Sequence, residues 1–179
     1  MDNKKINLQD KILIAGGSGM VGSAIYREMK RKGYGSKKYN SEIYIPSRKE
    51  LNLMNNNDVR DWFNRFNPDV VVLAAAKVGG ILANKTLPYD FIFENLKIKN
   101  NIIFNAWKSG VKRLLFLGSS CIYPKFAAQP IQEESLLKGA LELTNEPYAI
   151  AKIAGIKLCS ALKRQYGFDA ISLMPTNLY

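Results

Sequence analysis

The strongest constraint on the fold is a regular alternation of short, continuously apolar segments with segments of helical spacing. The apolar segments predict strands over residues 11–15, 42–46, 69–76, 113–118 and 170–174. Strands without polar alternation are buried on both faces, as in a parallel sheet covered by helices. With right-handed crossovers, this order predicts an α/β fold of the Rossmann type, a doubly wound parallel sheet with helices on both faces.

Helices are predicted between these strands, over residues 20–32, 55–66, 88–109 and 147–166. Gly33 and Gly110 follow the first and third of them, and Pro88 opens the third, which are the positions that these residues favour. The longest irregular segment is 123–146, and loops of that length usually serve a site. We expect one domain over residues 1–179, because a chain of this length forms one core and hardly two.

The composition, with 47% apolar and 23% charged residues, is that of an ordinary globular protein. No apolar run approaches the roughly 20 residues that cross a bilayer. The polar N-terminus does not resemble a signal peptide, so we expect a cytoplasmic protein without a membrane partner. Cys121 and Cys159 form no CxxC pair and the chain has no histidine, so we predict free thiols and no metal site.

The formal net charge of +11 allows two interpretations. A basic surface attracts nucleic acid through its phosphates without any sequence code. Here the cations are dispersed, and the densest group, at Arg31, Lys32, Lys37 and Lys38, has no interleaved aromatic residues to stack on bases. We therefore expect a solvated surface and no nucleic-acid partner, in a field that tolerates small molecules bearing phosphate.

A glycine-rich turn with the pattern GxxGxxG follows the first predicted strand immediately. Glycine allows the positive φ and the close backbone approach that such a turn needs. The helix after it presents unpaired N–H groups to a pyrophosphate, and this setting between strand and helix disfavours a tight turn without a ligand. The predicted cofactor residues of the turn are Gly16, Gly17, Ser18, Gly19, Met20, Val21 and Gly22.

The end of the second predicted strand favours NADP(H) over NAD(H). An enzyme that uses NAD places an acid there for the ribose hydroxyls, whereas this chain has Ser47 and Arg48, and no acid before Glu50. A guanidinium pairs well with the oxygens of a 2′-phosphate. The alternative is that Arg48 is only a surface cation.

Tyr148 and Lys152 stand at i and i+4 in the last predicted helix and so share one face. A nearby ammonium lowers the pKa of a tyrosine from about 10 by about 1–3 units, which suits a proton donor. The alternative is a core tyrosine beside a solvated lysine. Ser119 and Ser120 argue against it, because they follow the preceding strand at the edge where such sheets bind ligands.

At these residues the chain resembles the extended short-chain dehydrogenases/reductases that act on nucleotide sugars, and among them the GDP-fucose synthases. The resemblance covers nearly the whole chain, and Cys121 makes the stretch 119–124 its most specific part. The segments that carry it are GMVG at 19–22, AAAKVGG at 74–80, GSSCIYP at 118–124, NEPYAIAK at 145–152 and PTNLY at 175–179.

The resemblance implies epimerisation at C3 and C5 of GDP-4-keto-6-deoxy-mannose and reduction at C4 by NADPH. By that resemblance Ser119 hydrogen-bonds the keto oxygen, Tyr148 protonates it, and Lys152 tunes Tyr148 and holds the nicotinamide ribose. Cys121 would be an acid/base of the epimerisation; the alternative is a buried thiol acting as a small hydrophobe. The further cofactor residues implied are Asn52, Leu53, Ala75, Leu117, Gly118, Ser119, Ser120, Pro175, Thr176, Asn177 and Leu178.

The resemblance also implies a homodimer through helices 88–109 and 147–166. The chain departs from the family in three ways: it lacks the family's second acid/base histidine, it lacks the substrate domain, and it has Ser18 where some relatives have arginine. We therefore expect an N-terminal part of a longer protein that is inactive alone. The alternatives are a nucleotide-sugar 4-epimerase or dehydratase, disfavoured by Arg48, and a non-catalytic NADP-sensing module, disfavoured by the intact Tyr148 and Lys152.

Overall fold

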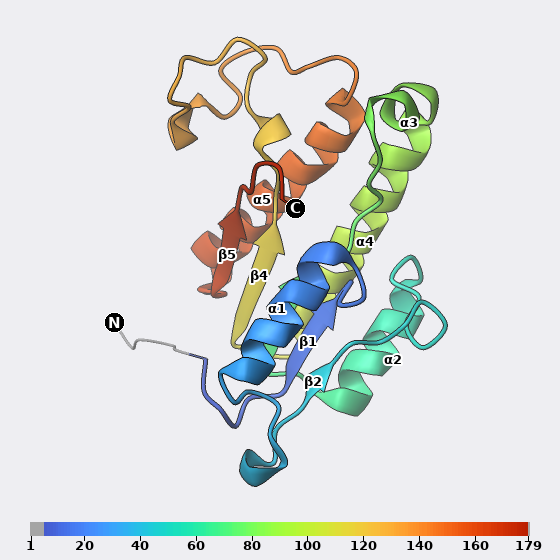
Figure 1. Cartoon of the computed structure of the whole chain (residues 1–179), viewed down its shortest axis with the longest axis vertical. Helices are drawn as coiled ribbons and strands as arrows, with labels where there is room; N and C mark the ends of the chain where they lie inside the picture. The colour runs from blue at the N-terminus through green and yellow to red at the C-terminus, as the bar shows by residue number, and fades with distance from the viewer. Residues whose placement is uncertain (1–5, 179) are drawn as a thin grey trace.

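A five-stranded parallel sheet forms the centre of the computed structural model, which describes residues 6–178 (Figure 1). Tyr179, the last residue of the predicted PTNLY motif, lies outside the described residues. The strands are β1 (Ile12–Ala15), β2 (Ile43–Tyr44), β3 (Val70–Leu73), β4 (Arg113–Leu117) and β5 (Ala170–Leu173), in the order β2-β1-β3-β4-β5. The α/β fold with a parallel sheet is confirmed.

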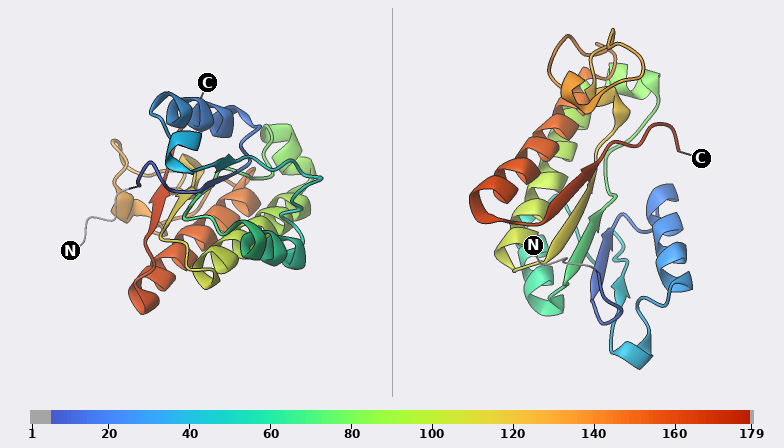
Figure 2. Two further views of the ribbon diagram at one scale, coloured as in Figure 1. Left: turned by 90° about the horizontal axis from the view of Figure 1, so that it is seen from below. Right: turned by 90° about the vertical axis from the view of Figure 1, so that its left-hand side faces the viewer.

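Helices cover both faces of this sheet. They are α1 (Met20–Arg31), α2 (Asn56–Phe66), α3 (Ile81–Thr86), α4 (Pro88–Lys108) and α5 (Glu146–Tyr166). Helix α1 lies on one face, and α2, α4 and α5 lie on the other (Figure 2, left). Alternate strand residues serve the two layers: Leu13 and Val71 join the core beneath α2, α4 and α5, whereas Ile12 and Val70 join the core beneath α1.

The observed ends of most elements agree with the predictions to within a few residues. Asn55 caps α2 by accepting a hydrogen bond from the Asn57 N–H at 2.9 Å, and Gly110 takes φ +74° after α4. Two differences stand out. Strand β2 pairs over two residues instead of five, and the short helix α3 was not predicted.

A glycine on α5 allows this helix to lie close to the sheet and to α4. A Cβ at Gly155 would stand 2.4 Å from Cζ of Phe116 and 3.0 Å from Cδ of Lys99. Ile153 and Ile156 of α5 are also turned inward, each with an exposed fraction of 8%. The face of α5 that points to solvent is marked by Ile150, which is 42% exposed.

Strand β5 is the less protected edge of the sheet. Among the described residues it pairs with β4 alone. Ile171 and Leu173 on it are 36% and 48% exposed, because α1 covers the opposite end of that face (Figure 2). The loop 123–146 lies beyond the carboxyl end of β4, near the start of α5 (Figure 1).

Candidate active site

A cleft of about 970 Å³ opens along the carboxyl edge of the sheet, where the loops after β1, β3, β4 and β5 meet. This is the edge at which doubly wound sheets bind their ligands. Most of the predicted cofactor residues line it: Gly16, Ser18, Gly19, Met20, Val21, Gly22, Arg48, Asn52, Leu53, Ala75, Leu117, Gly118, Ser119, Lys152, Pro175, Thr176, Asn177 and Leu178.

The glycine-rich turn joins β1 to α1 with its backbone close to neighbouring chain. Gly16 has φ +86°, and a Cβ there would stand 2.6 Å from the backbone nitrogen of Ala75. A Cβ at Gly22 would stand 2.2 Å from the carbonyl oxygen of Gly16. Gly19 caps α1 without any side-chain hydrogen bond, and the first turn carries no acid. The first N–H groups of α1 therefore remain available to an anion, which fits the pyrophosphate of a dinucleotide.

Gly17 has a different role from its neighbours in the turn. It does not line the cleft, and a Cβ there would stand 2.4 Å from Cγ2 of Ile45. The structure thus places this predicted cofactor residue in a packing contact with the segment after β2.

Arg48 lines the end of the cleft next to β2, together with Asn52 and Leu53. The nearest acid in sequence, Glu50, is turned away: its carboxylate accepts a hydrogen bond from the Ser47 N–H at 2.7 Å, which lowers the pKa of Glu50. Glu50 does not line the cleft. This end therefore offers a cation and no acid, which suits a phosphate better than two ribose hydroxyls.

Ser119, Tyr148 and Lys152 line the cleft together, although they come from the end of β4 and from α5. Lys152 is 6% exposed, and its ammonium donates a hydrogen bond to the carbonyl of Leu117 at 2.7 Å. It stands 5.5 Å from the centre of the Tyr148 ring. The sequence prediction that these groups share one place in the fold is consistent with this geometry.

The predicted effect of Lys152 on Tyr148 is wrong. Burial raises the pKa of Tyr148 to about 12, and a hydrogen bond with Ser119 offsets only part of that rise. Burial likewise lowers the pKa of Lys152 to about 8. The reason is that the ammonium is directed to the Leu117 carbonyl, while loss of solvent disfavours both charged forms. Tyr148 is consequently a protonated phenol near neutral pH.

Cys121 and Ser120 lie beside the cleft without lining it. Both belong to a short 3₁₀ turn, Ser120–Ile122, that follows Ser119. The Cys121 N–H donates to Oγ of Ser119 at 3.4 Å, and the Ser120 N–H donates to the carbonyl of Pro175 at 3.1 Å. Cys121 is half-buried, and burial raises the pKa of its thiol.

Lys77 and Glu94 are cleft residues that sequence reasoning missed. The Lys77 ammonium lies 3.1 Å from the Glu94 carboxylate, and both residues line the cleft. Lys77 could have been predicted as a cleft residue, because it comes just after β3 at the carboxyl edge of the sheet. Nothing in the sequence indicated Glu94, because it lies within a long helix far along the chain.

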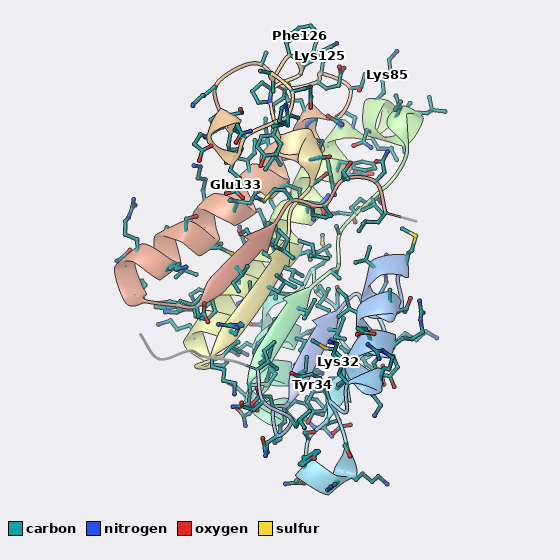
Figure 3. All side chains as sticks on the ribbon, turned by 60° about the vertical axis from the view of Figure 1, so that its left-hand side comes forward. Lys32, Tyr34, Lys85, Lys125, Phe126 and Glu133 are labelled. Atoms are coloured by element: carbon teal, nitrogen blue, oxygen red, sulfur yellow. The ribbon has the colours of Figure 1, made fainter. Side chains whose placement is uncertain are left out.

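The remaining cations are spread over the molecule, as expected for a solvated surface. Figure 3 shows Lys32 near one end and Lys85 and Lys125 near the other. Within residues 6–178, no cluster of metal-ligating side chains is found. In the same range, no helix is long and apolar enough to span a membrane.

Comparison with known proteins agrees with this geometry. The model of the NAD dependent epimerase/dehydratase family matches residues 12–179. The chain is 56% identical over 171 residues to a GDP-L-fucose synthase of Escherichia coli (strain K12), covering 96% of this chain and 51% of that protein. It is 56% identical over 169 residues to GDP-L-fucose synthase 1 of Arabidopsis thaliana, covering 94% and 50%. The chain thus spans about half the length of the curated relatives it matches.

Solved structures of proteins named for GDP-sugars are similar to this chain over nearly its whole length. A GDP-mannoheptose C4 reductase from Campylobacter jejuni with NADP bound has a TM-score of 0.91 at 37% identity, over 98% of this chain and 54% of that one. A GDP-L-fucose synthetase from Naegleria fowleri bound to NADP has a TM-score of 0.83 at 27% identity, over 98% and 52%.

Proposed function

The chain belongs to the NAD dependent epimerase/dehydratase family, and from this premise we propose that it forms the NADP(H)-binding part of a GDP-L-fucose synthase. Such an enzyme epimerises GDP-4-keto-6-deoxy-mannose at C3 and C5 and reduces it at C4. The observation that carries the proposal is one cleft that joins a glycine turn and Arg48 to Ser119, Tyr148 and Lys152. Identity of 54–56% to GDP-L-fucose synthases supports the choice of substrate.

NADP(H) fits the cleft at both ends. The free N–H groups at the start of α1 would hold the pyrophosphate, and Arg48 would pair with the 2′-phosphate. The cofactor supplies the hydride for C4. Lys152, whose pKa is about 8 and whose side chain is directed to the Leu117 carbonyl, would hold the nicotinamide ribose as a cation at neutral pH.

Ser119 and Tyr148 would act on the oxygen at C4. Ser119 donates a hydrogen bond to the keto oxygen, which orients the carbonyl and draws electron density from C4. Tyr148 then transfers its proton to the developing alkoxide. Its pKa of about 12 keeps the phenol protonated before that step, as a general acid requires.

Cys121 is the proposed acid/base of the epimerisation. The C4 ketone acidifies the hydrogens at C3 and C5, and Cys121 lies two positions beyond Ser119, the proposed anchor of that ketone. Because burial raises the pKa of its thiol, Cys121 rests in the protonated form and is better placed to return a proton than to remove one.

The full-length product of the gene tests the function directly. Incubated with GDP-4-keto-6-deoxy-mannose and NADPH, it should oxidise NADPH and release GDP-fucose, and Tyr148→Phe should abolish the oxidation. No oxidation of NADPH by the wild-type protein would overturn the proposal. Conversion of a nucleotide sugar by bound NAD without net oxidation of NADPH would favour a 4-epimerase or dehydratase instead.

We also propose a homodimer formed through α4 and α5. These helices pack against each other on the outer side of the molecule (Figure 2), and their outward face carries Tyr89, Phe93, Phe104 and Ile150, which are 38–67% exposed. Such an apolar face suits a helical interface. Ile150→Glu should convert the dimer to a monomer in sedimentation equilibrium, whereas a wild-type monomer at high micromolar concentration would refute the dimer.

The cytoplasm is the proposed location, since Cys121 and Cys159 are free thiols.

A further inference from the structure

Asn95 of α4 makes a set of hydrogen bonds that leaves none of its amide groups unused. Its side-chain oxygen accepts from the Lys77 N–H at 3.0 Å, and its side-chain nitrogen donates to the Lys77 carbonyl at 3.0 Å. The same nitrogen donates to the carbonyl of Phe91 at 2.7 Å. Asn95 is only 4% exposed. One buried amide therefore pairs with both backbone groups of a single residue 18 positions earlier in the chain.

The segment that Asn95 holds is a wall of the cleft. Residues 74–79 follow β3, have no regular secondary structure, and all line the cleft. The ends of the segment are fixed by Ala74, whose N–H donates to the carbonyl of Ala15, and by Gly79, whose carbonyl accepts from Asn84. Among the described residues, Ala75, Ala76 and Val78 make no backbone hydrogen bond. Within residues 6–178, the pair with Asn95 is thus the single set of hydrogen bonds that holds the backbone of the segment between its two ends.

The position of this wall matters because it touches the glycine turn. The backbone nitrogen of Ala75 lies only 2.6 Å from the position that a Cβ of Gly16 would take, so a small shift of the wall would press on the turn. The neighbour of Asn95 acts on the same residue, since Glu94 holds the Lys77 ammonium at 3.1 Å. Consecutive residues of α4 therefore fix the backbone and the side chain of Lys77.

We infer that Asn95 is a positioning residue that sets the Lys77 wall of the cleft for the cofactor, acting through the Lys77 backbone without touching the cofactor itself. This role rests on the proposed binding of NADP(H). This role differs from general support of the fold. If Asn95 merely stabilised the fold, replacing another buried asparagine of α4 would affect cofactor binding equally.

Asn105 provides the matched control. It lies on the same helix, is 3% exposed, and donates to Oδ1 of Asn56 at 2.9 Å and to the Asn101 carbonyl at 2.8 Å. It does not line the cleft. Asn95→Leu and Asn105→Leu each remove a buried amide of nearly the same size from α4, so both should lower stability.

The experiment uses the full-length gene product and two readouts. Hydrogen exchange with mass spectrometry should show faster deuterium uptake over residues 74–80 in Asn95→Leu and no change there in Asn105→Leu. Titration should show a Kd for NADPH at least tenfold higher in Asn95→Leu and within twofold of wild type in Asn105→Leu. Equal uptake, or an equal Kd, in wild type and Asn95→Leu would overturn the inference, as would equal effects in the two variants.

Asn95→Asp serves if Asn95→Leu does not fold. It keeps an acceptor for the Lys77 N–H but sets a carboxylate against the Lys77 carbonyl, so NADPH should bind weakly at neutral pH and more tightly as the carboxyl is protonated. A pH profile that runs parallel to wild type would contradict the positioning role. If wild type itself fails to bind NADPH, the proposed function is wrong, while exchange over residues 74–80 still decides whether Asn95 anchors the wall.

Discussion

Replacing Lys99 by methionine should stabilise the protein at neutral pH. Lys99 of α4 is 4% exposed, and its ammonium donates one hydrogen bond, to Oδ1 of Asn100 at 3.0 Å. Within the described residues no carboxylate forms an ion pair with Lys99, and the one titratable group that contributes to the shift of its pKa is the Cys159 thiol. Burial accordingly lowers the pKa of Lys99 from 10.5 to about 8.

The size of the effect follows from linkage. The folded pKa lies below the unfolded value, so at neutral pH the fold carries a charge that it disfavours, and stability rises as the pH increases from about 8 to 10.5. A difference of about 2.5 pKa units, at about 1.4 kcal/mol each, gives a cost of about 3 kcal/mol at pH 7 and about 2 kcal/mol at pH 9. Lys99→Met removes this cost while retaining most of the packing volume.

Urea unfolding followed by tryptophan fluorescence at pH 7 and pH 9 measures both values. Comparing each variant with wild type at the same pH cancels the parallel titration of Lys152. Lys97→Met, an exposed position on the same helix, is the control and should change the free energy of unfolding by less than about 0.5 kcal/mol. A Lys99→Met protein that is no more stable than wild type, or whose gain is the same at both pH values, would refute the reasoning.

Three further predictions concern the cofactor, the chemistry and the packing. Arg48→Ala should weaken NADPH binding about tenfold and leave NADH unchanged, because an exposed charge-assisted contact is lost; equal wild-type affinity for the two cofactors in a titration would end the NADP assignment. In the full-length product, Cys121→Ser should slow solvent deuterium exchange at C3 and C5, whereas Tyr148→Phe should stop reduction but permit exchange. Mass spectrometry separates these steps. Exchange at the wild-type rate in Cys121→Ser would show that Cys121 is only a packed thiol without a role in the epimerisation. Gly155→Ala should cost about 1–3 kcal/mol in urea unfolding, because the new methyl group overlaps Phe116, and an unchanged midpoint would contradict that contact.

The features readable from sequence were those decided by local pattern. Strand β3 was predicted from a continuous apolar run, and helix α4 from a helical period bounded by Pro88 and Gly110. The glycine turn could be placed at the cleft because strand, turn and helix are contiguous. Helix α3 escaped prediction since it is six residues long and its Ile81 and Leu82 are exposed, which removes the amphipathic signal.

The site was harder to predict from the sequence wherever it depends on how deeply a side chain is buried and in which direction it points. The sequence spacing placed Lys152 next to Tyr148, but it did not show where the Lys152 ammonium points. Because the ammonium points to the Leu117 carbonyl and both residues are buried, the pKa of Tyr148 is raised and not lowered. The pairing of Asn95 with Lys77 spans residues with no local relation, so no periodicity indicates it. Ile153 and Ile156 illustrate the same limit: the apolar spacing of α5 does not show which of its faces points to solvent, and both residues are buried.

The open edge at β5 bears on how the isolated chain would behave at high concentration. Within residues 6–178, the outer side of β5 pairs with no other strand. With Ile171 and Leu173 exposed, it is a template on which another copy can add a strand, the first step toward aggregation. The net charge of +11 opposes that encounter through mutual repulsion, with a range of about 8 Å at physiological ionic strength. Added salt shortens this range, so colloidal stability should fall as ionic strength rises. Ile171→Lys should still protect the edge at high salt, because an added strand would then have to bury a charge.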